Sequence, residues 1–536
     1  MSITSFRFVL FVLVVLFVYY AVPARFRWMI LLISSAAFYL SFQVWGIFVL
    51  IATALVVWYF ALLIQKQKEL LADWMKENRE TASKEERKAK KELYTKKQRS
   101  YLIAAVAVCL ALLFLCKYYG KLAFSIGELL HAKLWTAEKI LLPLGISYYS
   151  LQLIGYITDV QRDVTAAEKN PLKVILFGVF FLSIMQGPFN RYDRLMPQLT
   201  DPERKRPDRK QMKIAGYRIF WGYVKKMCIA DQVGILAGEV FSHYARYSGL
   251  GICLGIVCFA VQLYADFSGY MDIVVGIGQL FGIQLPENFR QPFFSKSMSE
   301  FWRRWHITLG EWLKDYVLYP ILKSKPFKTL GKFLNEKLGK NAGRMIPVFA
   351  GDLILWVLIG AWHGAGFNYV FGVGILQFLY ILIGELTEKL RSGAKTALHI
   401  REAGILWHVV QSLIVTALML FAWVFFNSPS MHDALGVLSR VFAGGIRGAQ
   451  ISVLFSGESA LADASLRNFA VYIVLCIAAL LTVDLVHEKG VCISEAAMEK
   501  GFAAEAALFV VLFFALVIFG AYGSRYSAGN FIYFEF

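Results

Sequence analysis

Long apolar runs separated by short polar stretches form the main pattern of this chain. The runs approach the roughly 20 residues that a helix needs to cross a bilayer. They are continuous rather than alternating, which favours helices over the strands of a membrane barrel. We interpret as helical the runs at residues 6–22, 28–42, 44–64, 101–119, 140–160, 172–187, 214–240, 250–283, 346–363, 367–386, 404–427, 468–486 and 504–522.

This pattern predicts an all-α polytopic membrane protein. We expect about 11 transmembrane helices plus re-entrant and interfacial helices, because some neighbouring runs can be halves of one broken helix. The chain has 536 residues and is 58% hydrophobic, whereas a soluble domain is about 45–50% apolar. Residues 6–22 lack a strongly basic start and a small-residue cleavage site, so we expect a retained helix rather than a signal peptide.

The polar stretches predict how the chain is organised around one membrane domain, residues 1–536. Residues 65–100 mix Lys, Arg and Glu and indicate a charged cytoplasmic insert, a helical hairpin or extended helix with a solvated face. Binding of anionic lipid is the alternative. Residues 288–345 are rich in basic and aromatic side chains and predict re-entrant or interfacial helices on the cytoplasmic side. Residues 428–466 are lightly charged, which indicates an extracytoplasmic loop.

Charge and cysteine content narrow the class of protein. The formal net charge is +18, and the positive-inside rule explains it in a membrane protein. No aromatic and basic cluster of the nucleic-acid type lies outside the membrane-flanking loops, so we expect a lipid bilayer as partner and no nucleic acid. The seven cysteines form no CxxC pair, which argues against a disulfide framework or a metal site. We expect no bound cofactor.

Polar side chains interrupt the run at 140–160. Tyr148, Gln152 and Tyr156 are spaced four residues apart and share one helix face. A wet cavity would suit such a face, and hydrogen bonding between helices would suit it equally. We keep Tyr148 and Gln152 as candidate binding residues.

Two carboxylates, Asp266 and Asp272, lie in the run at 250–283. Six residues apart on a helix, the two side chains point about 240° around the axis from each other, so the two cannot face one cavity centre. We interpret them mainly as structural partners of nearby arginines or tyrosines, and keep Asp266 as a candidate binding residue.

His363 stands out among the eight histidines. Six others lie near predicted segment ends and are interpreted as structural: His131, His243, His399, His408, His432 and His487. His363 ends an apolar run and has Gly360, Gly364 and Gly366 around it. Glycines let another backbone or a ligand come close. An ionisable group at membrane depth is a functional-site hypothesis by default, and a buried core histidine is the alternative.

His306 ends the segment Trp302-Arg303-Arg304-Trp305-His306. Trp302, His306, Leu309 and Leu313 follow helical spacing, which places His306 on an aromatic, apolar face with Arg303 and Lys314 elsewhere. The patch is either an interfacial anchor or a site for a phosphate-rich donor, paired by arginines. Candidate binding residues here are Trp302, Arg303, Arg304, Trp305 and Asn288 of the preceding Pro-Glu-Asn turn.

A neutral histidine is suited to act as general base near pH 7, for example on a hydroxyl that attacks an acyl thioester. No GxSxG, P-loop or HExxH motif is present. From these residues alone the chain is a polytopic membrane enzyme or a transporter with a buried histidine. No internal repeat is evident, which disfavours an inverted-repeat transporter.

Five segments and the tail resemble the membrane-bound O-acyltransferase (MBOAT) family, in its alginate O-acetyltransferase-like branch. The resemblance covers most of the chain. Its segments are Leu142–Arg162, Gln186–Leu199, Tyr264–Arg290, Ser299–Ile321, which contains WRRWHITL, Gly360–Val373, which contains AWHG, and Phe531–Phe536.

The resemblance implies a ring of helices around a tunnel, with His363 as general base and His306 nearer a cytoplasmic donor entrance. It implies acetyl-CoA as donor and O-acetylation of an extracytoplasmic polysaccharide, together with an SGNH-type partner, in a bacterial cytoplasmic membrane. D-alanyl transfer to teichoic acid from a carrier protein is the alternative within the family. A transporter of polysaccharide or lipid-linked sugar, or a scaffold that recruits an extracellular enzyme, are alternatives outside it.

Overall fold

The computed structural model describes residues 1–117, 142–247, 249–364, 366–401, 404–443 and 466–522. The described chain is helical, and its one bridge between extended residues joins Phe289 and Trp305. The predicted all-α class is therefore confirmed for these residues. Within them, eight helices are long and apolar enough to cross a membrane: Val44–Glu77, Lys84–Lys117, Leu250–Leu280, Lys340–His363, Phe367–Leu386, Ile405–Asn427, Val471–Glu488 and Phe502–Phe519.

Backbone contacts divide the chain into two compact units. The first comprises Met1–Met212 and Ile277–Pro286, and the second Lys213–Gly276 and Glu287–Phe536. Helix α11 (Leu250–Leu280) contributes to both units. The expectation of a single membrane domain stays a prediction.

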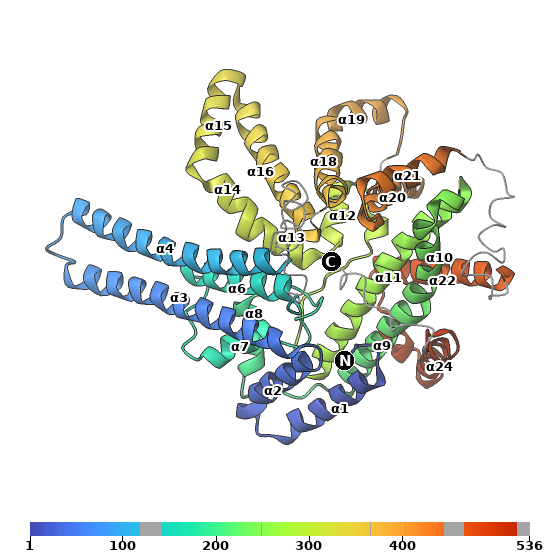
Figure 1. Cartoon of the computed structure of the whole chain (residues 1–536), viewed down its shortest axis with the longest axis horizontal. Helices are drawn as coiled ribbons and strands as arrows, with labels where there is room; N and C mark the ends of the chain where they lie inside the picture. The colour runs from blue at the N-terminus through green and yellow to red at the C-terminus, as the bar shows by residue number, and fades with distance from the viewer. Residues whose placement is uncertain (118–141, 248, 365, 402–403, 444–465, 523–536) are drawn as a thin grey trace, which may run out of the picture. The chain divides into compact units, whose positions relative to one another are not determined.

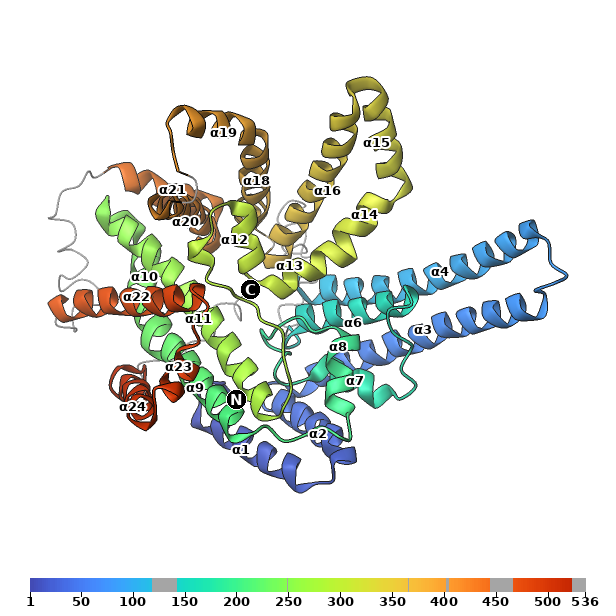
Figure 2. The same cartoon turned by 180° about the vertical axis from the view of Figure 1, so that it is seen from behind.

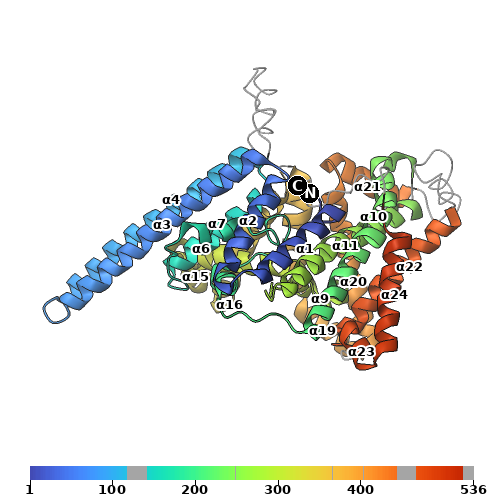
Figure 3. The same cartoon turned by 90° about the horizontal axis from the view of Figure 1, so that it is seen from below.

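The first unit carries short and long helices together (Figure 1). They are α1 (Phe6–Ala21), η1 (Ala24–Phe26), α2 (Arg27–Leu40), α3 (Val44–Glu77), α4 (Lys84–Lys117), α6 (Ile146–Gln161), α7 (Pro171–Val179) and α8 (Tyr192–Thr200). Helices α3 and α4 lie side by side along their length (Figure 3). The charged stretch 65–100 forms the far half of this hairpin, which is one of the two helical forms expected, and its place on the cytoplasmic side stays a prediction.

Local capping chemistry explains the turn of this hairpin. Asn78 caps the end of helix α3, and its side-chain amide donates to the carbonyl oxygen of Trp74 over 3.0 Å. Helix α4 begins with a capping box, in which the Ser83 N–H donates to Glu86 over 2.8 Å and the Glu86 N–H donates to the Ser83 hydroxyl over 3.1 Å. These bonds satisfy backbone groups that a helix end leaves without partners.

One predicted helix of the first unit is wrong. The run at 172–187 was expected to be a single helix, but α7 ends at Val179 and residues 181–186 form turns. Residues 180–186 are mostly apolar and are buried, but they lie in no helix. Hydrophobicity alone cannot distinguish a buried turn from a buried helix.

The second unit contains α9 (Arg209–Tyr223), η2 (Val224–Ala230), α10 (Asp231–Ser242), η3 (Tyr244–Arg246), α11, η4 (Pro292–Phe294), α12 (Met298–Arg304), α13 (Ile307–Leu313), η5 (Lys314–Leu318), α14 (Tyr319–Lys323), α15 (Lys325–Leu338), α16 (Lys340–His363), α17 (Phe367–Tyr369), η6 (Val370–Ile375), α18 (Leu376–Leu386), α19 (Glu388–Ala397), α20 (Ile405–Asn427), α21 (Met431–Ala443), α22 (Leu466–Glu488), α23 (Ile493–Glu499) and α24 (Phe502–Phe519). Helices α15 and α16 lie side by side (Figure 2). Residues 288–345 form short helices up to the start of α16, as predicted, and their membrane side stays a prediction.

The stretch 428–466 is not a loop throughout. It begins with helix α21, and residues 444–465 lie outside the described residues. Helix α21 buries Ala434 and Val437, which lie one turn apart, and exposes Leu435.

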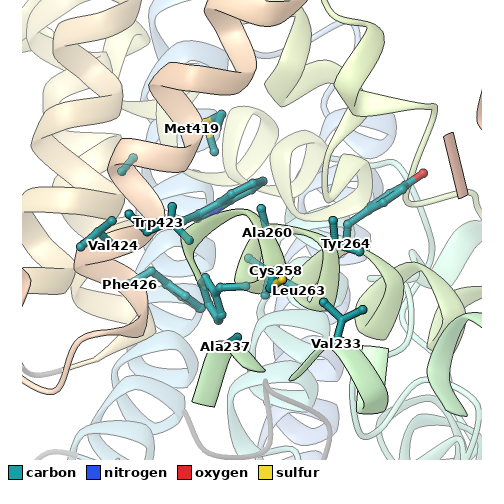
Figure 4. Close-up of a cluster of buried hydrophobic side chains, with 14 of the residues drawn as sticks. Val233, Ala237, Cys258, Ala260, Leu263, Tyr264, Met419, Trp423, Val424 and Phe426 are labelled. Carbon is teal, nitrogen blue, oxygen red and sulfur yellow. The ribbon is translucent and has the colours of Figure 1, made fainter. Parts of the chain in front are cut away.

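The hydrophobic core of the second unit brings α10, α11 and α20 together. Figure 4 shows Trp423 and Phe426 of α20 with Leu263 and Tyr264 of α11 in one buried cluster. The core positions the candidate site, since Leu263, Met419, Trp423 and Phe426 also line its cavity.

Candidate active site

A cavity of about 250 Å³ in the second unit is lined by both singled-out histidines, His306 and His363. Most of its wall is apolar or aromatic. Four charged side chains also line it, namely Arg303, Lys314, Asp352 and Glu385. The cavity follows helix α16, because Asp352 and His363 both line it and lie eleven residues, or about 16 Å, apart along the helix axis.

His363 ends helix α16 and is buried. Its ring makes edge contacts with Trp362, at 4.8 Å between centroids, and with Phe426, at 5.4 Å. The following residue, Gly364, is in extended backbone, so the helix stops at the histidine. A side chain at Gly364 would place its Cβ 2.6 Å from the Tyr369 ring, which explains why a glycine is required here.

Gly360, one turn before His363, allows a close helix contact at the site. A Cβ there would lie 2.7 Å from the Cα of Val370 and 2.8 Å from the carbonyl oxygen of Tyr369. The predicted close approach of another backbone is therefore confirmed, and that backbone belongs to α17 and η6. This contact holds the end of α16 against the π-helical segment that follows it in sequence.

His306 lies between two short helices rather than within one. Helix α12 ends at Arg304 and α13 starts at Ile307, while His306 has a φ of 47° and a ψ of 51°. This left-handed conformation is uncommon for residues other than glycine, and histidine adopts it more often than most. The helical spacing of Trp302, His306 and Leu309 therefore spans two short helices, with the left-handed His306 between them.

The break in the helix changes which side chains reach the cavity. Trp302, His306 and Leu309 line it as the helical spacing suggested. Arg303 and Lys314, which were expected to point elsewhere, line it too. The cavity is therefore more strongly charged than the sequence indicated.

The Pro-Glu-Asn turn supports His306 from behind. The Ile307 N–H donates to the Asn288 carbonyl oxygen over 3.1 Å, and the Arg290 N–H donates to the Arg304 carbonyl oxygen over 2.9 Å. The Asn288 side-chain oxygen lies 3.3 Å from His306 Nδ1. Phe267 packs edge-on against the imidazole, with centroids 4.9 Å apart. His306 is 4% exposed, and its burial lowers the pKa of its imidazole to about 3.

The remaining candidates of this segment divide into two groups. Trp302, Arg303 and Trp305 line the cavity. Arg304 instead forms ion pairs with Glu488 over 2.6 Å and with Glu300 over 2.7 Å. Asn288 contacts His306 without itself lining the cavity.

Asp266 and Asp272 are engaged by internal cations. Asp266 pairs with Lys226 over 2.6 Å, and both side chains are 2% exposed. Asp272 pairs with Lys225 over 2.6 Å and with Arg218 over 3.0 Å. Neither carboxylate lines the cavity. Both carboxylates form ion pairs, as the structural interpretation expected, and their partners are two lysines and one arginine.

Tyr148 and Gln152 belong to α6 in the first unit, and both are buried. Tyr148 stacks on Phe189 with centroids 4.7 Å apart. Tyr156, on the same helix face, accepts a hydrogen bond from the Glu168 N–H over 2.9 Å. That bond ties the helix to a neighbouring segment, so hydrogen bonding rather than a cavity explains this part of the face.

Sequence reasoning missed several cavity residues, of which Gln377 is the most informative. The Trp302 indole donates to its side-chain oxygen over 3.3 Å, and its side-chain nitrogen donates to the Gly372 carbonyl oxygen over 3.2 Å. Asp352, Lys314 and Glu385 were missed as well. A polar residue inside an apolar run was the available signal for Gln377 and Asp352.

Comparisons with known proteins identify a family and several relatives that the chain is similar to. The model of the membrane-bound O-acyltransferase family (MBOAT) matches residues 38–335, which include His306 and stop before His363. The chain is 30% identical to the probable alginate O-acetylase AlgI of Pseudomonas syringae, over 70% of this chain and 69% of the relative. It is 29% identical to a peptidoglycan O-acetyltransferase of Helicobacter pylori, over 56% of each chain.

A third relative has a different acyl group in its name. The chain is 27% identical to a teichoic acid D-alanyltransferase of Bacillus subtilis, over 54% of this chain and 69% of the relative. The family model covers more than half of the 536 residues, and the eight candidate spans agree with a multi-pass membrane enzyme. The chain belongs to the membrane-bound O-acyltransferase family.

Proposed function

We propose that the protein moves an acetyl group from acetyl-CoA to an acceptor outside the cytoplasm, for O-acetylation of a cell-surface polysaccharide. The observation that carries this proposal is that His306 and His363 line one cavity with a largely aromatic and apolar wall. Such a wall excludes water, and water would otherwise hydrolyse the thioester.

In the proposed reaction His363 is the general base. It takes the proton of an acceptor hydroxyl while that oxygen attacks the thioester carbonyl carbon. The new carbon–oxygen bond forms, the carbon–sulfur bond breaks, and the departing sulfur receives the proton from the histidine. No other reactant is needed, so the step balances as thioester plus alcohol giving ester plus thiol.

We propose that the cavity is part of a tunnel through a ring of helices. Arg303 and Lys314 line it and can pair with the phosphates of a donor. Asp352 lies about 16 Å from His363 along α16. A cavity of this length can hold charged side chains at an entrance and the proposed general base His363 at a distance from them. His306 then belongs nearer the donor entrance, on the cytoplasmic side.

We propose a bacterial cytoplasmic membrane as the location, since the relatives named above are bacterial proteins. An extracytoplasmic SGNH-type partner would pass the acetyl group to the polysaccharide. The names of two relatives, an alginate acetylase and a peptidoglycan acetyltransferase, support a polysaccharide acceptor.

Ester content at the cell surface tests this function. Cells that carry His363→Ala should lose O-acetylation of their surface polysaccharide while the variant accumulates in the membrane at the wild-type level. His408→Ala is the matched control, because His408 lies on α20 and does not line the cavity. Unchanged ester content in the His363→Ala cells would refute the proposal.

D-alanyl transfer is the second candidate, favoured by the similarity to the Bacillus subtilis enzyme. A D-alanyl group carries an ammonium, which the cavity residues Asp352 and Glu385 could pair with. Mass analysis of the released esters separates the candidates, because acetate and D-alanine differ in mass. Export of glycan without any ester would instead favour a transporter.

A further inference from the structure

Three polar groups lie within hydrogen-bond distance of the side-chain oxygen of Asn288. It lies 3.0 Å from the backbone nitrogen of Thr308, 3.0 Å from the Thr308 hydroxyl and 3.3 Å from His306 Nδ1. Asn288 is 1% exposed. The same amide therefore caps the first turn of α13 and touches the ring of His306.

The identity of these atoms follows from the backbone. A backbone N–H can only donate, so the atom of Asn288 that faces Thr308 must be the amide oxygen. The amide nitrogen points to the sulfur of Met271 at 3.5 Å. Because an amide oxygen only accepts, the hydrogen between it and His306 must sit on Nδ1. A neutral imidazole with its proton on Nδ1 keeps the lone pair on Nε2.

The position of Asn288 is itself fixed by its neighbours. Glu287 receives two hydrogen bonds from Arg218, over 2.7 Å and 2.6 Å, and Arg218 also binds Asp272 over 3.0 Å. The Asn288 carbonyl oxygen accepts from Ile307. Charge-assisted pairs of this geometry are strong and directional, so the amide is held on both sides.

We propose that Asn288 is a positioning residue, which holds His306 as the Nδ1–H tautomer and so leaves Nε2 as the proton-accepting nitrogen of that ring. The role in catalysis rests on the proposed acyl transfer, whereas the tautomer rests on the hydrogen bonds alone. The low pKa of the buried His306 agrees with a neutral ring. The other ionisable side chains of the cavity are Arg303, Lys314, Asp352, Glu385 and His363.

Two variants at Asn288 test its proposed role in positioning His306 for catalysis. Asn288→Ala removes the acceptor and should lower kcat by about 10²-fold, the scale of one misplaced acid–base group, with little change in KM. Asn288→Asp keeps an acceptor oxygen but adds a negative charge beside the ring. It should raise the pKa of His306, which a pH titration of the ring nitrogens followed by NMR measures.

A matched control carries the same charge change elsewhere. Asn78→Asp at the end of α3 should leave the titration of the His306 ring as in the wild type. A residue that only supports the fold would lower the amount of folded protein without moving this titration. A His306 ring that titrates in Asn288→Asp as it does in the wild type overturns the proposal.

Nitrogen NMR of histidine-labelled protein tests the tautomer without any activity assay. The difference between the spectra of wild type and His306→Gln assigns the ring of His306. At pH 6 we expect a protonated Nδ1 and an unprotonated Nε2, and loss of that preference in Asn288→Ala. A protonated Nε2 in the wild type overturns the assignment. If the tautomer is found but no acyl transfer is measured, the proposed function fails and this assignment stands.

Discussion

His306 combines three unusual properties in one residue. It is buried, it adopts a left-handed backbone conformation, and its ring contacts an asparagine that caps the next helix. A side chain in that conformation costs of the order of 1–3 kcal/mol unless the surroundings favour it. Here the surroundings are the paired segment at Asn288 and Phe289, which suggests that the strain serves the site.

The neutral state of His306 predicts a pH-dependent stability. The folded ring has a pKa of about 3, whereas the unfolded ring titrates near 6.5. Between these values the unfolded chain binds a proton that the folded chain does not, so stability falls as the pH drops below about 6.5. From pH 7 to 5.5 the wild type should lose about 1 kcal/mol more free energy of unfolding than His306→Gln, measured by denaturant titration in detergent. An equal loss in the two proteins would contradict this.

Lys226 is the most costly charge to disturb. Its ammonium is 2% exposed and lies 2.6 Å from Asp266 and 2.8 Å from Asp231. Lys226→Met removes this cation from the buried Asp266 and the partly buried Asp231 and should cost about 3–5 kcal/mol of stability. Lys213→Met removes an ammonium that is 52% exposed and pairs with Glu505, so it should cost at most about 1 kcal/mol.

Thermal unfolding of the two variants in the same detergent checks this difference. Adding Asp266→Asn to Lys226→Met should recover part of the loss, because one of the two uncompensated carboxylates is then neutral. Equal stability of Lys226→Met and Lys213→Met would show that the buried ion pair between Lys226 and Asp266 does not stabilise the fold.

At the scale of elements, the crossing of α16 and η6 depends on glycine. Gly360→Ala would place a methyl group 2.7 Å from the Cα of Val370, and backbone cannot move aside cheaply. We expect a lower melting temperature and a loss of acyl transfer, because His363 lies one turn away. Gly384→Ala on α18, where nothing lies within 4 Å of the added carbon, should be neutral or slightly stabilising. Activity and melting temperature of both variants provide the check, and a fully active Gly360→Ala enzyme would contradict it.

Elements with strong sequence signals were predictable, and those shaped by tertiary packing were not. The charged half of the α3–α4 hairpin follows from its Lys, Arg and Glu content. The turns after α7 did not follow, since Phe180 and Leu182 are as apolar as helix residues. The break at His306 was hidden because the Asn288 cap that stabilises it comes from 18 residues away in sequence.

At the scale of the whole molecule, the sequence identified both histidines but not the composition of the cavity around them. His306 and His363 were found because each is an ionisable group in an aromatic or glycine-rich setting. Lys314 and Glu385 belong to the cavity only through the arrangement of η5 and α18, which no local pattern contains. Asp266 was kept as a binding candidate, but its partner Lys226 lies 40 residues away.

The orientation of the chain in the membrane is a further prediction at this scale. The basic hairpin of α3 and α4 should face the cytoplasm, because loops rich in Lys and Arg stay inside. A single cysteine placed at the exposed Lys88, with the native cysteines replaced, should react with an impermeant maleimide only after the cells are opened. Labelling of intact cells would contradict this orientation.

Transfer of labelled acetyl groups by the purified protein tests the central claim most directly. Wild-type protein in lipid nanodiscs should release free thiol from acetyl-CoA and pass the label to an acceptor hydroxyl. His363→Ala and His306→Ala should each lose this transfer by about 10²-fold or more, while His408→Ala keeps it. Wild-type transfer rates in folded His363→Ala protein would contradict the account.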